Sequence, residues 1–122
     1  MRRSIFITQD DVQSPHWLNA FPDCVIQTAC PKKLLADTLI WLLADSADWQ
    51  VQLQKLTAQR LPVIVMTTQL DIQQLCDALQ LGARGYIEAF ANRTVIEQVA
   101  ETVNAGGIWL PGQLLFNLAG VL

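Results

Sequence analysis

The sequence has few of the residues on which most enzyme and metal sites depend. It contains one histidine among 122 residues, and its three cysteines lack the paired C-x-x-C spacing of zinc sites. No glycine-rich phosphate loop follows the first apolar run, and there is no nucleophile-elbow motif. These absences argue against an enzyme. We expect Cys24, Cys30 and Cys76 to be buried, reduced thiols.

Charge and long apolar runs are also scarce. Only 16% of the residues are charged, the net charge is −3, and the basic residues form no patch of the kind that binds nucleic acid. After Arg2 and Arg3 only three apolar residues follow, too few for a signal-peptide core, and no run is long enough to span a membrane. With 52% hydrophobic residues, the composition predicts one ordered, cytoplasmic domain with no membrane contact.

The clearest pattern lies in residues 61–89. An uninterrupted apolar run at 63–66 is typical of a parallel strand that is buried on both faces. Asp71 can cap a helix whose apolar residues recur at helical spacing, and Gly82 stands where that helix would end in a left-handed turn. Residues 85–87 then begin another short strand. This order predicts a βαβ unit.

The rest of the chain alternates apolar runs with polar stretches. Residues 46–59 fit a strand or a helix by spacing, but their Gln-rich filling and the need for a crossover favour a helix. Asn92 can cap a last long helix that Gly106 and Gly107 end. We therefore expect strands at 4–8, 24–28, 38–44, 63–66 and 85–87, and helices at 16–21, 31–36, 46–59, after Asp71 and after Asn92.

Five strands that alternate with helices predict an α/β fold. The expected architecture is a doubly wound, flavodoxin-like parallel sheet in the order 2-1-3-4-5, with helices on both faces. Residues 1–106 would form this domain, and residues 107–122 an extended segment followed by an apolar helix at 113–122. Ligands of such sheets bind at the carboxyl ends of the strands, so any chemistry is expected there.

Three stretches together resemble one known family. PVIVMTT, ALQLGARGYI and AETVNAGGIWLPGQLL resemble, in this order and spacing, the receiver domain of NarL/LuxR-type response regulators. The resemblance implies a CheY-like fold and a role in two-component signalling and transcription regulation. It also implies that residues 107–122 lead to a helix-turn-helix domain that is not in this chain, so that DNA would be bound only through that domain.

The resemblance also implies where the chemistry of a receiver should lie. The phosphoacceptor aspartate at the end of the third strand corresponds to Leu42, which has no nucleophilic atom, and the lysine after the fifth strand corresponds to Ala89. The switch hydroxyl corresponds to Thr67 and the switch aromatic to Tyr86. With the acceptor and the lysine both replaced, the resemblance implies a degenerate receiver that does not run the usual phosphotransfer.

Two acidic groups leave alternatives open. The acidic pair that would hold Mg²⁺ falls on Gln9 and Asp10, or on Asp10 and Asp11, and these residues fit a solvated turn equally well. We expect no cofactor beyond a weak Mg²⁺ site. Asp45, three residues after Leu42, could serve as a substitute phosphoacceptor if the third strand is longer than expected.

Other residues have a structural and a functional interpretation. Thr67 can form a local hydrogen bond instead of acting as a switch, and Tyr86 can be ordinary packing. The resemblance implies a homodimer formed through the face of the fourth helix, fifth strand and fifth helix. The apolar end of the chain is a second candidate interface, because exposed apolar surface of that extent would mark one. The candidate interface residues are Gln73, Gln74, Asp77, Arg84, Glu88, Trp109, Leu115 and Phe116.

Three functions are consistent with these observations. The first is the receiver-like regulatory domain of a LuxR/NarL-type transcription regulator that acts by dimerisation, by a partner protein or by a small ligand. The second is a working receiver that is phosphorylated at Asp45. The third is a stand-alone cytoplasmic α/β protein that binds a ligand or partner at the edge near Gln9, Asp10 and Thr67.

Overall fold

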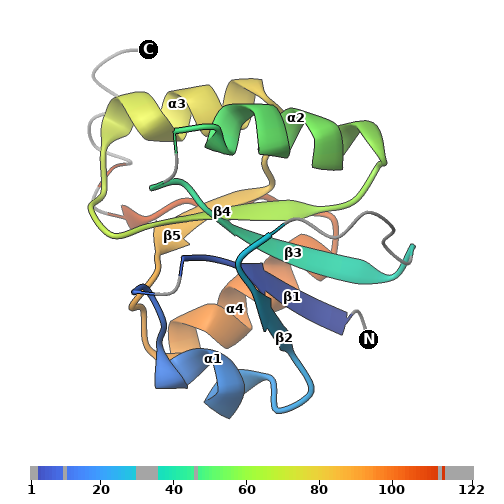
Figure 1. Cartoon of the computed structure of the whole chain (residues 1–122), viewed down its shortest axis with the longest axis vertical. Helices are drawn as coiled ribbons and strands as arrows, with labels where there is room; N and C mark the ends of the chain where they lie inside the picture. Colours follow the sequence, from blue (N-terminus) through green and yellow to red (C-terminus); the bar gives the residue numbers. More distant parts are fainter. Residues whose placement is uncertain (1–2, 10, 30–35, 46, 113, 115–122) are drawn as a thin grey trace.

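The computed structural model describes residues 3–9, 11–29, 36–45, 47–112 and 114. The described elements alternate between strand and helix along most of the chain (Figure 1). In chain order they are β1 (Arg3–Ile7), α1 (Pro15–Ala20), β2 (Val25–Gln27), β3 (Thr38–Leu43), α2 (Trp49–Ala58), β4 (Val63–Thr67), α3 (Ile72–Gln80), β5 (Gly85–Glu88) and α4 (Arg93–Asn104).

The strands form one five-stranded parallel sheet in the order β2-β1-β3-β4-β5. This is the predicted α/β, CheY-like topology, which is therefore confirmed. The central strand β3 is buried at every position, because β1 and β4 flank it and helices cover both of its faces. Its register places Leu42 beside Ile7 of β1 and Val65 of β4.

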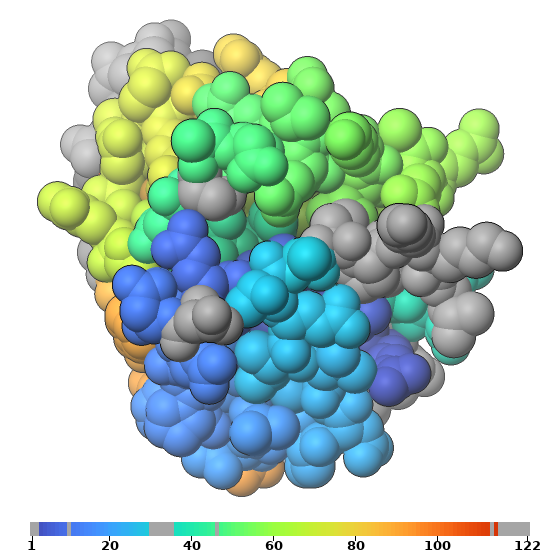
Figure 2. Space-filling model, viewed as in Figure 1, coloured from blue at the N-terminus to red at the C-terminus, as the bar shows by residue number. Residues whose placement is uncertain are grey.

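The helices lie on both faces of the sheet and enclose two separate cores. In Figure 1, α2 and α3 cover one face, whereas α1 and α4 cover the other. Alternate residues of β3 point to opposite faces, so Leu42 belongs to the core under α2 and α3, and Trp41 and Leu43 belong to the core over α1 and α4. Figure 2 shows the same two layers as surface, with residues of α2 on one side and of α1 on the other.

Aromatic packing fills the core over α1 and α4. The Phe6 ring is stacked against Trp17 at a centroid distance of 4.8 Å and against Trp41 at 5.1 Å. Both indole rings are fully buried, and the Trp41 indole donates a hydrogen bond of 3.2 Å to the Ser4 hydroxyl. Trp41 is therefore part of this core.

Capping residues set where the helices begin. The side chains of Ser14, Asp71 and Asn92 accept hydrogen bonds from backbone N–H groups in the first turns of α1, α3 and α4. Proline follows Ser14 as the first residue of α1. The caps at Asp71 and Asn92 confirm the predictions from the sequence.

Some predicted boundaries differ from the structure. The predicted helix at 46–59 is a helix, but it spans Trp49–Ala58. The strand predicted at 24–28 is shorter, and β1 begins and ends one residue earlier than expected. The helices predicted at 31–36 and 113–122 fall almost entirely outside the described residues. No helix in the part of the chain that the structure describes is long and apolar enough to cross a membrane.

The chain after α4 returns along the free edge of β5. Trp109 forms a parallel bridge with Gly85: its carbonyl accepts a hydrogen bond of 3.2 Å from the Tyr86 N–H, and its own N–H donates to the Arg84 carbonyl at 3.0 Å. The half-buried Trp109 side chain packs on the core over α1 and α4. This extended segment therefore shields part of an edge that would otherwise present unpaired backbone groups.

Candidate functional site

The candidate site lies where β3, β4 and β5 end and α3 begins. Asp45 follows β3 by two residues and is exposed, and the Thr68 hydroxyl donates a hydrogen bond of 2.7 Å to its Oδ2 atom. Thr67, Thr68, Asp71 and Gln74 line a hollow beside this pair. A carboxylate and a hydroxyl from neighbouring strands thus meet at the edge where parallel α/β sheets bind ligands.

Tyr86 is held below this edge by a set of hydrogen bonds. Its ring is fully buried, and its hydroxyl donates to Gln74 Oε1 at 2.6 Å while accepting from the Asp71 N–H at 3.1 Å. Gln74 Nε2 in turn donates to the Ala44 carbonyl at 3.4 Å. These bonds, which we call the Tyr86 clamp, join β5, the first turn of α3 and the end of β3.

Thr67 faces the interior and makes a local turn. It is buried, its hydroxyl donates to the Gln69 carbonyl at 2.8 Å, and the same oxygen accepts from the Gln69 N–H at 3.2 Å. This is the local hydrogen bonding that Thr residues often form at the end of a strand. Thr68, and not Thr67, is the hydroxyl that contacts a carboxylate here.

Leu42 and Ala89 are both fully buried. Leu42 lies in the core under α2 and α3, in the same cluster as Val65 and Leu75. The Ala89 carbonyl accepts a hydrogen bond of 2.9 Å from the indole N–H of Trp17, which ties α1 to the end of β5. Each position is therefore occupied by apolar packing, with no charged group at either one.

The acidic residues predicted to hold Mg²⁺ lie only partly within the described residues. Asp10 lies outside the described residues, and Asp11 is exposed. The Leu42 side chain offers no oxygen to a metal, and the described residues contain no group of three or more His, Cys, Asp or Glu side chains that could hold one. We therefore assign no chemical step to a metal here.

The predicted interface residues have different surroundings. Gln73 is exposed on α3 and donates to Asp77 at 3.0 Å, whereas Gln74 points inward to the Tyr86 clamp. Arg84 and Glu88 are exposed at opposite ends of β5. Trp109 is half-buried on its own domain, and Leu115 and Phe116 lie outside the described residues. Of the described thiols, Cys24 and Cys76 are free and partly buried.

The Tyr86 clamp predicts a measurable dependence of stability on pH. Burial raises the pKa of the Tyr86 phenol above its ordinary value, the Asp71 and Asp45 charges act in the same direction, and the hydrogen bonds to the phenol oppose them. The folded state therefore holds the proton more tightly than the unfolded state. The resulting contribution of Tyr86 to the free energy of unfolding is complete below the unfolded pKa of about 10. It is lost as the pH rises through the folded pKa.

The chain has a single tyrosine, so the ultraviolet absorbance of phenolate reports Tyr86 alone. We expect its titration midpoint in the folded protein to lie above that of the protein in urea. Tyr86→Phe should lose about 1–3 kcal/mol of stability at neutral pH, because it leaves Gln74 and the Asp71 N–H without their partner. Equal midpoints in the folded and denatured protein would show that the phenol is not held in this way.

Comparisons with known proteins find similarity at the level of structure. No protein-family model and no curated protein matches the sequence. The crystal structure of a LuxR family DNA-binding response regulator from Silicibacter pomeroyi matches with a TM-score of 0.68 at 17% sequence identity, over 93% of this chain and 99% of that chain. The chain thus has the fold of that response regulator.

Proposed function

We propose that this chain is a receiver-like regulatory domain of a LuxR/NarL-type transcription regulator, and that it signals through protein contacts without phosphotransfer. The fold and the similarity to a LuxR family DNA-binding response regulator support the first part. DNA would be bound by a helix-turn-helix domain beyond residue 122, toward which residues 107–122 would lead.

The observation that carries the second part is the burial of Leu42. In a parallel sheet of this order, a nucleophile would have to reach the carboxyl edge near the end of β3. Leu42 stands at the position that the resemblance gives to the acceptor, is fully buried, and packs in the core under α2 and α3. Ala89, at the position of the lysine, is equally buried and could not balance the charge of an acyl phosphate.

The Tyr86 clamp supports a single, phosphate-independent conformation. In the family that the chain resembles, this aromatic belongs to the switch. Here its hydroxyl is bonded to both the side chain of Gln74 and the backbone of Asp71. Turning the ring outward would break two hydrogen bonds and expose buried apolar surface, so the buried position is strongly favoured without any modification.

The experiment is sedimentation of the chain before and after treatment with Mg²⁺ and a small phosphodonor. We expect a homodimer whose dissociation constant does not change with the treatment. The surface offered for dimerisation is the face of α3, β5 and α4, which includes Gln73, Asp77 and Glu88. A dimer that forms only after phosphodonor treatment would contradict the proposal.

One observation favours a second candidate function, phosphorylation at Asp45. This carboxylate is exposed at the carboxyl edge, and the Thr68 hydroxyl already lies 2.7 Å from it, where it could donate to an acyl phosphate. If Asp45 is the acceptor, phosphodonor treatment should add one phosphoryl group that Asp45→Ala abolishes. The matched control, Asp23→Ala, removes another exposed aspartate and should keep the modification.

A further inference from the structure

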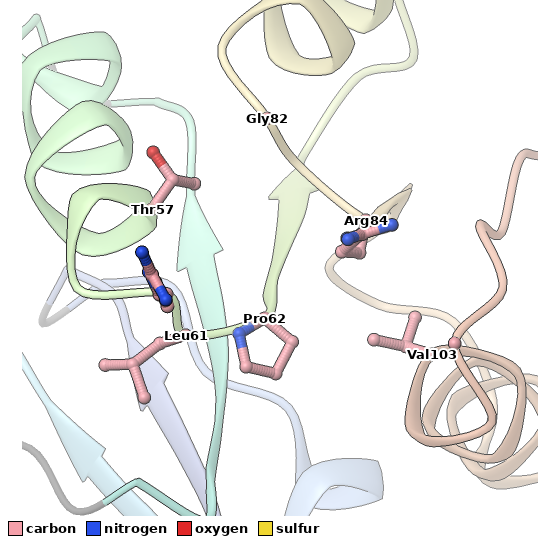
Figure 3. Close-up of a pocket in the computed structure, with 8 residues that line it drawn as sticks. Thr57, Leu61, Pro62, Gly82, Arg84 and Val103 are labelled. Atoms are coloured by element: carbon pink, nitrogen blue, oxygen red, sulfur yellow. The ribbon is translucent and has the colours of Figure 1, made fainter.

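A pocket lies at the edge of the sheet where β4 and β5 begin, opposite the carboxyl edge that holds Asp45 and Thr68. Its volume is about 440 Å³, and its lining comes from the ends of α2, α3 and α4 and the start of β4. Figure 3 shows Thr57 on one side, Arg84 and Val103 on the other, and Pro62 between them. Its lining includes the apolar side chains of Leu61, Pro62 and Val103, of which Leu61 and Val103 are buried.

All three helices end at this pocket in the same way. The residue after each C-cap has a positive φ angle: 61° at Arg60, 98° at Gly82 and 91° at Gly106. Each of these residues lines the pocket. Glycine is the usual residue in this left-handed conformation, because a side chain is strained there. Arg60 is therefore the exception, and its backbone strain requires an explanation at the pocket.

Two arginines at one pocket concentrate positive charge there. Arg60 and Arg84 are both exposed at its rim, and no acidic side chain is among the described residues that line it. Within the described residues, the ion pair of Arg93 with Glu97 is the only one formed by an arginine, and neither guanidinium at the pocket makes a hydrogen bond. Their donors are thus available to a ligand.

The helix ends offer an alternative explanation. The C-terminus of a helix carries a partial negative charge, which a nearby arginine stabilises. However, an arginine on the last turn would serve that purpose without left-handed strain, as Lys55 does on α2. The two guanidinium groups also make no hydrogen bonds to the helix-end carbonyls in the described residues. The helix ends therefore account for a positive charge here, but not for the left-handed backbone of Arg60.

We propose that this pocket binds a small organic anion, with its phosphate or carboxylate groups between Arg60 and Arg84 and its carbon skeleton on Pro62 and Val103. Guanidinium groups bind both kinds of anion through paired N–H donors. This site is independent of the proposed function, because it lies at the opposite edge of the sheet from Asp45 and the Tyr86 clamp.

The test is titration of the ¹⁵N-labelled chain with pyrophosphate and, separately, with citrate, at constant ionic strength. We expect the backbone amide signals of Gly82 and Gly106 to shift in a saturable way, while that of Gly112, which does not line the pocket, stays in place. A saturable shift with pyrophosphate alone would identify a phosphate ligand, and a shift with citrate alone would identify a carboxylate ligand. Saturable shifts with both would identify a site for either anion.

Variants that each remove one positive charge distinguish specific binding at this pocket from non-specific electrostatic attraction of anions. Arg60→Gln and Arg84→Gln should each weaken binding about tenfold or more, because each removes a charge-assisted contact. Arg60→Gly should weaken it equally while the fold is kept, since glycine suits the backbone at φ 61°. Lys55→Gln removes a charge from the same helix outside the pocket and should leave binding unchanged. No saturable shift, or an equal loss with Lys55→Gln, would overturn the proposal.

Discussion

Leu42→Asp is expected to lower the unfolding free energy by about 4–5 kcal/mol at neutral pH, enough to unfold a marginally stable domain. The substitution places the acceptor residue of a working receiver at its corresponding position. Because Leu42 is fully buried among apolar side chains, the new carboxylate would be charged without a partner. The protein should therefore lose stability and gain no phosphorylation.

The matched control is Leu42→Asn, which has the same shape and no charge. Burial raises the pKa of a carboxyl, so the new aspartate of Leu42→Asp should be protonated at a higher pH in the folded state than in the unfolded state. The penalty relative to Leu42→Asn is full above the folded pKa and disappears as the pH falls below the unfolded value of about 3.9. Urea unfolding at several pH values measures this difference. Equal stability of the two variants at pH 7 would mean that position 42 opens to solvent.

Trp17→Ala is the second large effect, with an expected loss of about 3–5 kcal/mol. The indole is fully buried, stacks on Phe6 at 4.8 Å, and donates to the Ala89 carbonyl at 2.9 Å. Truncation removes the apolar contact and leaves that carbonyl unpaired. Trp17→Phe should lose less, since it keeps the aromatic contact and loses the hydrogen bond.

Leu18→Ala provides a neighbouring control on the same short helix. Leu18 is 50% exposed, so its truncation should change stability by about 0.5 kcal/mol or less. Urea unfolding followed by far-ultraviolet circular dichroism compares the three variants. If Trp17→Ala and Leu18→Ala had similar effects, α1 would not be anchored to β5 through Trp17.

The sequence was sufficient to predict the fold because the fold depends on local and repeated signals. Continuous apolar runs marked β3 and β4, since a strand buried on both faces needs no polar positions. The caps at Asp71 and Asn92 were readable because capping needs only one side-chain oxygen beside the first turn. The predicted helix at 46–59 began too early, because no side-chain capping hydrogen bond marks the first turn of α2.

The candidate site was less predictable because its contacts join residues far apart in the chain. Asp45 and Thr68 are 23 residues apart, and Trp17 and Ala89 are 72 residues apart. Gln74 looked like a surface residue from its helical spacing, yet its amide contacts Tyr86. Asp45, Thr67 and Tyr86 could be named in advance, but not the contacts of Asp45 with Thr68 and of Tyr86 with Gln74. The left-handed backbone of Arg60 had no signal, since arginine rarely occupies that position.

Intact mass spectrometry shows whether this receiver-like domain accepts a phosphoryl group. The intact mass of the wild-type chain and of the Asp45→Ala variant would be measured after incubation with Mg²⁺ and a small phosphodonor. The account predicts an unchanged mass for both proteins, because Leu42 and Ala89 leave no acceptor and no cationic partner at the usual positions. One added phosphoryl group on the wild-type chain that is absent from Asp45→Ala would contradict the account and identify Asp45 as the acceptor of a working switch.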